Sequence, residues 1–138
     1  MNKLKKDIID YFENKTGVAA VYIFGSFGTV KKHYYSDIDI GILLDRYNAK
    51  IAGDLITDCI VELGMMLKRD IHPVILNSAS VELLRQIFTK GQCILIKDLK
   101  RLARFRMVKF VEIADFAYYR NQMQSGLIRK VMEGRTVG

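Results

Sequence analysis

The stretch FGSFGTVKKHYYSDIDIGILL, residues 24–44, joins two apolar runs through a polar connection. A Gly-Ser pair follows the first run, and an Asp-Ile-Asp triplet opens the second. Successive side chains of a strand point to opposite faces, so Asp37 and Asp39 share one face while the isoleucines around them share the other. The pattern predicts a strand that buries one face and directs two carboxylates toward a common site.

Two carboxylates this close repel each other unless a cation lies between them. Mg²⁺ prefers a few carboxylates together with phosphate and water oxygens, so the pair suits a metal–nucleotide site. Gly25 allows a tight turn and a close backbone approach, and Ser26 offers a hydroxyl and N–H groups to an anion. Lys31 and Lys32 lie in the connection and add positive charge for a polyphosphate. From spacing alone, a plain Gly-Ser turn with solvent-facing aspartates remains the alternative.

The rest of the chain alternates helical and strand patterns. Helices are predicted at 2–15, 50–67, 78–91 and 98–122, and strands at 18–24, 36–44, 69–77 and 92–96. Pro73 argues for an edge or a bulge in the third strand. We therefore expect one α/β or α+β domain, residues 1–122, with a small sheet of about four strands flanked by helices, and a flexible tail at 123–138.

Composition narrows the function classes. The net charge of +7 over 138 residues indicates attraction for a polyanion: nucleic acid, a nucleoside triphosphate or an acidic protein surface. No apolar run reaches the roughly 18 residues of a membrane span, and Asp7 and Asp10 interrupt the apolar part of the N-terminus, which argues against a secretory signal. A cytoplasmic protein is expected. Cys59 and Cys93 lie far apart in apolar segments and are predicted to be buried thiols rather than zinc ligands.

The motif from Gly25-Ser26 to Asp37-Ile38-Asp39, with its apolar flanks VYIF and IGIL, resembles the signature of the DNA polymerase β-like nucleotidyltransferase superfamily. The short chain resembles the minimal nucleotidyltransferase branch, which includes the antitoxins of HEPN/MNT toxin–antitoxin systems. The likeness covers about residues 1–120 and implies the nucleotidyltransferase fold.

The resemblance also implies a third carboxylate on a later strand, and Asp70 matches that position. Asp37, Asp39 and Asp70 would then be the catalytic residues and the ligands of Mg²⁺. Gly25, Ser26, Lys31 and Lys32 would bind the nucleotide, as the residues themselves suggest. The implied chemistry is in-line attack of an acceptor hydroxyl on the α-phosphate of ATP, with release of pyrophosphate.

A domain this short leaves little room for an acceptor-binding module, so the acceptor is expected on another chain. The family implies a HEPN ribonuclease toxin as partner, neutralised by transfer of AMP to a tyrosine, within a homo- or hetero-oligomer. Nucleic acid is not expected as a direct substrate, nor is a membrane. Two alternatives stay open: a non-catalytic antitoxin that only covers the toxin, and transfer to a small molecule such as an aminoglycoside.

A few residues qualify this interpretation. Many relatives carry a basic residue after the Gly-Ser pair, where Phe27 stands here. His33 is expected to be an exposed loop residue, whereas His72 alternates with Asp70 and is a candidate to line the pocket. The last helix carries a cationic cluster suited to a partner protein or RNA, or to a solvated face: Lys97, Lys100, Arg101, Arg104, Arg106 and Lys109.

Overall fold

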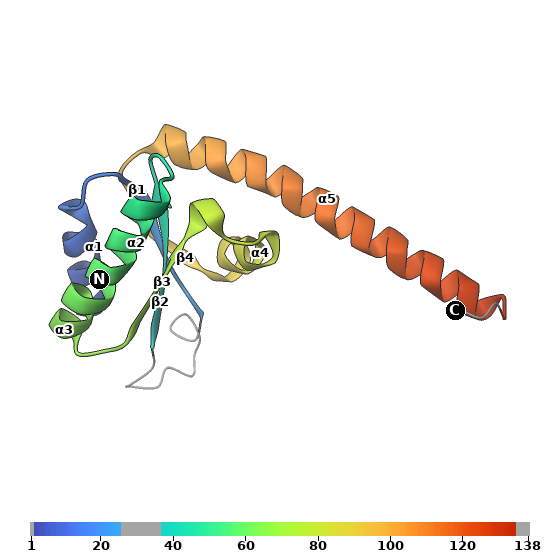
Figure 1. Cartoon of the computed structure of the whole chain (residues 1–138), viewed down its shortest axis with the longest axis horizontal. Helices are drawn as coiled ribbons and strands as arrows, with labels where there is room; N and C mark the ends of the chain where they lie inside the picture. Colours follow the sequence, from blue (N-terminus) through green and yellow to red (C-terminus); the bar gives the residue numbers. More distant parts are fainter. Residues whose placement is uncertain (1, 26–36, 135–138) are drawn as a thin grey trace.

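The computed structural model of the chain describes residues 2–25 and 37–134 and shows a four-stranded sheet with helices on both faces (Figure 1). The strands are β1 (Val18–Phe24), β2 (Ile38–Leu44), β3 (Ile71–Ile75) and β4 (Gln92–Ile96). The helices are α1 (Lys3–Glu13), α2 (Ala49–Asp58), α3 (Gly64–Leu67), α4 (Val81–Lys90) and α5 (Leu99–Met132). A π-helical segment, η2 (Cys59–Leu63), joins α2 to α3, and a short 3₁₀ turn, η3 (Leu76–Ser78), follows β3. The predicted mixed α/β class is confirmed.

The strands lie in the order β3-β2-β1-β4. β1 pairs antiparallel with both β2 and β4, while β2 pairs parallel with β3. β3 therefore forms one edge of the sheet, which agrees with the prediction from Pro73, because proline is tolerated on edge strands. Beyond the end of β3, the Asn77 side chain extends the pairing to the last residue of β2: its Oδ1 accepts from Leu44 N at 2.8 Å, and its Nδ2 donates to Leu44 O at 3.1 Å.

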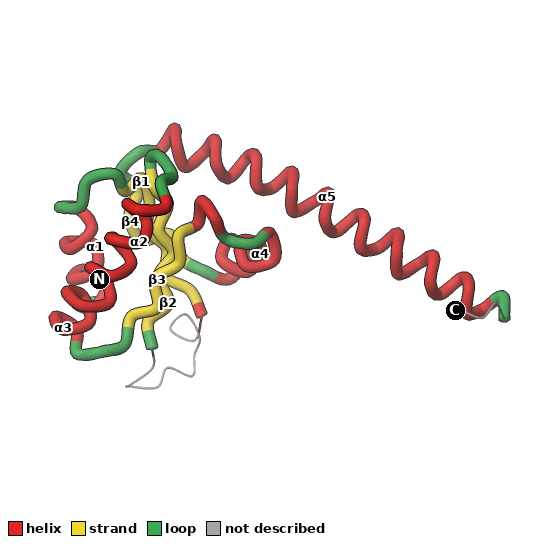
Figure 2. Tube along the Cα trace, in the orientation of Figure 1, coloured by secondary structure: helices red, strands yellow, loops and turns green. Residues whose placement is uncertain are grey.

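Each face of the sheet carries its own apolar core, and Figure 2 shows the helices on both sides of the strands. On one face, α1, α2 and η2 cover the even-numbered residues of β2, such as Ile38 and Ile40, both fully buried. On the other face, α4 and α5 cover Leu43 together with Tyr22 of β1. The alternation read from the sequence thus separates the two cores, and it places Asp39 on the same face as Leu43.

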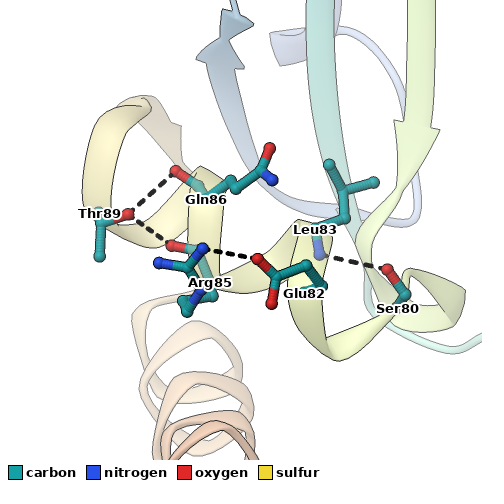
Figure 3. Close-up of polar contacts among 6 residues, drawn as sticks. All are labelled: Ser80, Glu82, Leu83, Arg85, Gln86 and Thr89. Carbon is teal, nitrogen blue, oxygen red and sulfur yellow. Dashed lines mark hydrogen bonds and ion pairs between the residues drawn. The ribbon is translucent and has the colours of Figure 1, made fainter. Parts of the chain in front are cut away.

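Local signals in the sequence explain where α4 begins. Ser80 is its N-cap, and the Ser80 hydroxyl accepts a hydrogen bond from Leu83 N at 3.2 Å (Figure 3). Within the helix, Arg85 pairs with Glu82 three residues earlier at 2.6 Å, and Thr89 Oγ1 donates to Arg85 O. The predicted helix from this serine is therefore confirmed, one turn shorter at its start than the range 78–91.

The helical segment predicted at 50–67 is interrupted by the π-helical turn. Leu55, Cys59 and Leu63 are buried as the pattern indicates, but Ile51 and Met66 are each 55% exposed. From Ile51 to Leu63 the apolar residues recur every four positions, a spacing that drifts by about 40° per step around a helix with 3.6 residues per turn, so Ile51 at the start of the series leaves the buried face. Burial raises the pKa of the Cys59 thiol to about 12, as expected of a structural thiol.

The last helix is longer than its pattern indicates. α5 continues to Met132 instead of ending near 122, so residues 123–132 are helical. Its buried residues are Leu102 and Phe105, both near its start, whereas Leu99, Val108 and Phe116 of the expected apolar side are exposed. Figure 1 shows the second half of α5 projecting away from the sheet and the other helices.

The cationic cluster of the last helix divides into residues with structural partners and residues facing solvent. Lys97 Nζ donates to the carbonyls of Phe12, Glu13 and Lys15 and so closes the end of α1. The Arg106 guanidinium lies over the rings of Phe88 and Phe110, which pack α5 against α4. Across residues 2–25 and 37–134, none of the helices is both long enough and apolar enough to cross a membrane.

Candidate active site

One end of the sheet brings the predicted motif residues together. β1 ends there, and the parallel strands β2 and β3 both begin there. Gly25 follows β1, Asp37 and Asp39 stand at the start of β2, and Asp70 directly precedes β3. Residues that are up to 45 positions apart in the chain therefore share one end of the sheet because of the strand directions alone.

Gly25 lies against the carboxylate of Asp39. Its φ of +76° is in the left-handed region, which L side chains rarely adopt. A Cβ atom built at this position would overlap Asp39 Oδ2. Glycine is thus required here twice over: once for the backbone turn after β1, and once for the space that the carboxylate occupies.

Asp39 is held in a partly dehydrated position. It pairs with Phe24 across the β1–β2 ladder, and its side chain is 29% exposed. Burial raises the pKa of the Asp39 carboxyl above its ordinary value; His72 acts in the opposite direction, and the nearby Asp37 adds to the rise. A cation beside this carboxylate would therefore stabilise its ionised form.

His72 is the residue that the structure adds most clearly to the site. It pairs with Asp39 across β2 and β3, and its Nδ1 lies 3.8 Å from Asp39 Oδ1. Its Nε2 lies 3.4 Å from Asp37 Oδ2. The imidazole therefore faces both carboxylates, one with each ring nitrogen. The alternation of Asp70 and His72 along one strand was the signal for this placement, and it supported His72 only as a lining residue.

The main chain of Asp70 is hydrogen-bonded to β2. Its carbonyl accepts from Ile38 N at 2.9 Å, which extends the β2–β3 pairing by one residue toward the carboxylates. The Asp70 side chain is exposed. Among the described residues, no three His, Cys, Asp or Glu side chains gather closely enough to hold a metal by themselves. The role of Asp70 as third ligand remains a prediction.

Three of the predicted nucleotide-binding residues, Ser26, Lys31 and Lys32, lie outside the described residues, as do Phe27 and His33. The described part of the site is the carboxylate pair with Gly25, Asp70 and His72. Two carboxylates at the start of β2, with that of Asp39 seated against Gly25, fit Mg²⁺, a hard cation that takes its remaining ligands from phosphate and water.

A four-stranded mixed sheet with helices on both faces, in a chain that carries the motif Gly-Ser…Asp-x-Asp where β1 ends and β2 begins, defines a nucleotidyltransferase. The family model "Polymerase beta, Nucleotidyltransferase" matches residues 6–100, so the chain belongs to this family. No curated protein sequence matches the chain significantly.

Solved structures of similar fold come from toxin–antitoxin complexes. One, a toxin–antitoxin pair with AMP-PNP, is 25% identical with a TM-score of 0.66, covering 93% of this chain and 98% of that one. An MntA–HepT complex is 22% identical with a TM-score of 0.62, covering 96% and 99%. A complex of tri-AMPylated HEPN toxin with MNT antitoxin from Shewanella oneidensis is 23% identical with a TM-score of 0.61, again covering 96% and 99%.

Proposed function

We propose that this chain is an antitoxin that transfers AMP from ATP to a tyrosine hydroxyl of a partner HEPN ribonuclease toxin. Family membership supports nucleotidyl transfer. The relative bound to AMP-PNP supports ATP as the donor, and the relative held with a tri-AMPylated toxin shows the product that such a reaction forms. Such a reaction draws on cytoplasmic ATP, and we place the protein there together with its toxin.

Each site residue has a separate role in this reaction. Asp37 and Asp39 would hold Mg²⁺, which when bound neutralises charge on the triphosphate. Gly25 lets the backbone approach the phosphates. The tyrosine oxygen forms a bond to the α-phosphorus in line with the leaving pyrophosphate, whose bond to phosphorus breaks. Asp70, at the same edge, would accept the tyrosine proton.

The observation that carries this proposal is the position of Asp39 between Gly25 and His72. A partly buried carboxylate with a raised pKa, pressed against a glycine that no other residue can replace, is costly for a structural site. Strained and dehydrated groups of this kind cluster at functional sites, where the ligand removes the cost.

The first test is calorimetric titration of ATP into the wild type and into Asp37→Ala/Asp39→Ala, first with Mg²⁺ and then with EDTA. We expect binding that requires both Mg²⁺ and the two aspartates. Labelled ATP and a HEPN toxin then test transfer, with a tyrosine-to-phenylalanine toxin as control. Transfer to the toxin by the double variant at the wild-type rate would contradict the proposal.

A non-catalytic antitoxin is the second candidate, and Phe27 favours it because a basic residue after the Gly-Ser pair is lost. The two candidates differ in what the Asp37/Asp39 double variant does in cells that express the toxin. Neutralisation by binding alone survives the substitution, whereas neutralisation by AMP transfer does not. Measuring toxin-dependent growth arrest beside labelled transfer separates the two.

A further inference from the structure

A groove runs along the outer edge of β3, opposite the helical segment formed by α2, η2 and α3. Its volume is about 940 Å³. Ile60, Val61 and Met65 line it from the helical side, and Ile71 and Pro73 line it from β3. We call this surface the acceptor groove, because it leads to the candidate active site.

The helical wall of the acceptor groove exposes more apolar surface than folding requires. Ile60 is 48% exposed, Val61 52% and Met65 76%. Exposed apolar residues scattered singly are common, but three that line one groove form a patch of the kind that binds a partner. Folding of this domain buries Cys59 and Leu63 from the same segment and leaves these three outward.

Two unusual backbone features lie along the same wall. The segment Cys59–Leu63 is π-helical, and such turns appear frequently at functional sites. Lys68, the residue after α3, has a φ of 55°, the only positive φ of a non-glycine residue in the described ranges. Lys68 is the C-cap of α3, and its left-handed conformation ends the helix where the chain turns toward β3. Both features shape the groove.

The acceptor groove is continuous with the carboxylate site. Asp70 and His72 belong to its lining, and His72 also faces Asp37 and Asp39 across 3.4 and 3.8 Å. A chain lying in the groove therefore passes the residues that stand beside the two carboxylates. In the described part of the sheet β3 pairs only with β2, so its outer edge is open to pairing with an extended segment, as edge strands are in strand-addition complexes.

We propose that the acceptor groove holds the toxin segment that carries the acceptor tyrosine, in extended form and with acidic residues beside Lys68. The inference rests on the proposed function and names the surface that selects its acceptor. Apolar side chains of the segment contact Ile60, Val61 and Met65, and the exposed Lys68 supplies the complementary charge. Pro73 has no N–H, so side-chain contacts contribute more than main-chain pairing at that point.

Peptide titration tests the groove without relying on activity. The ¹⁵N-labelled full chain is titrated with an eleven-residue peptide that has one central tyrosine and glutamate neighbours, and with a lysine-flanked counterpart. We expect the amide signals of Ile60, Val61, Met65 and Lys68 to shift with the glutamate peptide, which binds up to about 5-fold more tightly than its counterpart. Shifts of these signals with Mg-ATP alone, or with neither peptide, would overturn the proposal.

Kinetics with a HEPN toxin give the second arm. Met65→Asp, in the groove, is compared with Met107→Asp, which changes a similarly exposed methionine on α5. We expect only Met65→Asp to raise KM for the toxin, by about 10-fold, with kcat and KM for ATP unchanged. Equal toxin KM values in the two variants would refute the groove. If the wild type transfers AMP to no toxin, the proposed function fails, while the peptide titration still decides the groove.

Discussion

Asp39 and His72 stand side by side on two parallel strands, with His72 Nδ1 at 3.8 Å from Asp39 Oδ1. Sequence spacing placed two carboxylates at this edge, and the strand pairing adds a base that faces both. The pKa of Asp39 therefore depends on both neighbours: His72 lowers it and Asp37 raises it.

Asp39→Asn is expected to abolish AMP transfer and to stabilise the protein. Burial raises the pKa of Asp39, so the native state disfavours its ionised form. The cost to stability appears as pH rises from the unfolded-state pKa of about 3.9 through the raised native pKa, and it is fully present at pH 7. Thermal unfolding should show a melting temperature about 2 °C higher for the variant at pH 7, with no gain at pH 3.

The control for this substitution is Asp54→Asn, which changes an exposed aspartate of α2. An equal rise in melting temperature for both variants would assign the effect to net charge instead of to the environment of Asp39.

Gly25→Ala is expected to remove ATP binding. The alanine Cβ would overlap Asp39 Oδ2, and its φ would stay in the left-handed region. Gly17→Ala is the matched control, because Gly17 also has a positive φ, +83°, but open space around its Cβ position. Both variants should lose about 1 kcal/mol of unfolding free energy from backbone strain, measured in denaturant. Only Gly25→Ala should lose ATP affinity in calorimetry; retained affinity would contradict the close approach described here.

His72→Ala should raise the pKa of Asp39 further, because His72 is the neighbour that lowers it. Carboxyl ¹³C signals followed by NMR against pH report this value directly, without substrate or metal. The substitution is on an exposed side chain, so the fold should be retained. An unchanged or lower Asp39 pKa in the variant would show that the imidazole does not act on this carboxylate.

Asp70→Asn tests the third carboxylate. As a proton acceptor for the tyrosine, Asp70 should contribute to the rate of transfer and not to ATP binding, so we expect kcat to fall about 100-fold with ATP affinity unchanged. Rapid-quench measurement of a single turnover on the toxin isolates this step. A variant with wild-type kcat would remove Asp70 from the catalytic set and leave the two aspartates of β2.

Asn77→Ala should destabilise the fold without changing the site. Asn77 makes two hydrogen bonds to the main chain of Leu44, and both are lost. The expected cost is about 2 kcal/mol in unfolding free energy, because the Leu44 groups are buried and left unpaired. Urea denaturation gives the stability, and calorimetry with Mg-ATP should give unchanged affinity.

Strong local signals made most of the fold predictable from sequence. Strand β1 occupies 18–24 as predicted, because its residues are β-prone and glycines flank it. Ser80 marks the start of α4 by a cap that depends on two neighbouring residues only. Features that depend on distant contacts are harder to predict from the sequence. The π-helical turn at Cys59 interrupts a run of apolar residues that predicts one continuous helix, and no local signal in the run marks it.

In the candidate site, too, local signals are predictable from the sequence and contacts between distant residues are not. The motif identifies Asp37 and Asp39 as a pair because they alternate on one strand. Their relation to His72 depends on the register between β2 and β3, which no local pattern specifies. The continuation of α5 past residue 122 was also missed, since Gly126 and neighbouring polar residues are typical of a helix end, while the structure continues to Met132.

The projecting half of α5 makes one helix behave as two in hydrogen exchange. From Tyr118 to Gly134 every residue except Gly126 is exposed, so burial against the rest of the domain contributes little to the stability of these turns. Isolated helices of about 15 residues are marginal in water, so amides here should exchange at the rate of a fraying peptide. Amides around Leu102 and Phe105 should exchange only with global unfolding, and the boundary between the two rates would locate where the domain ends.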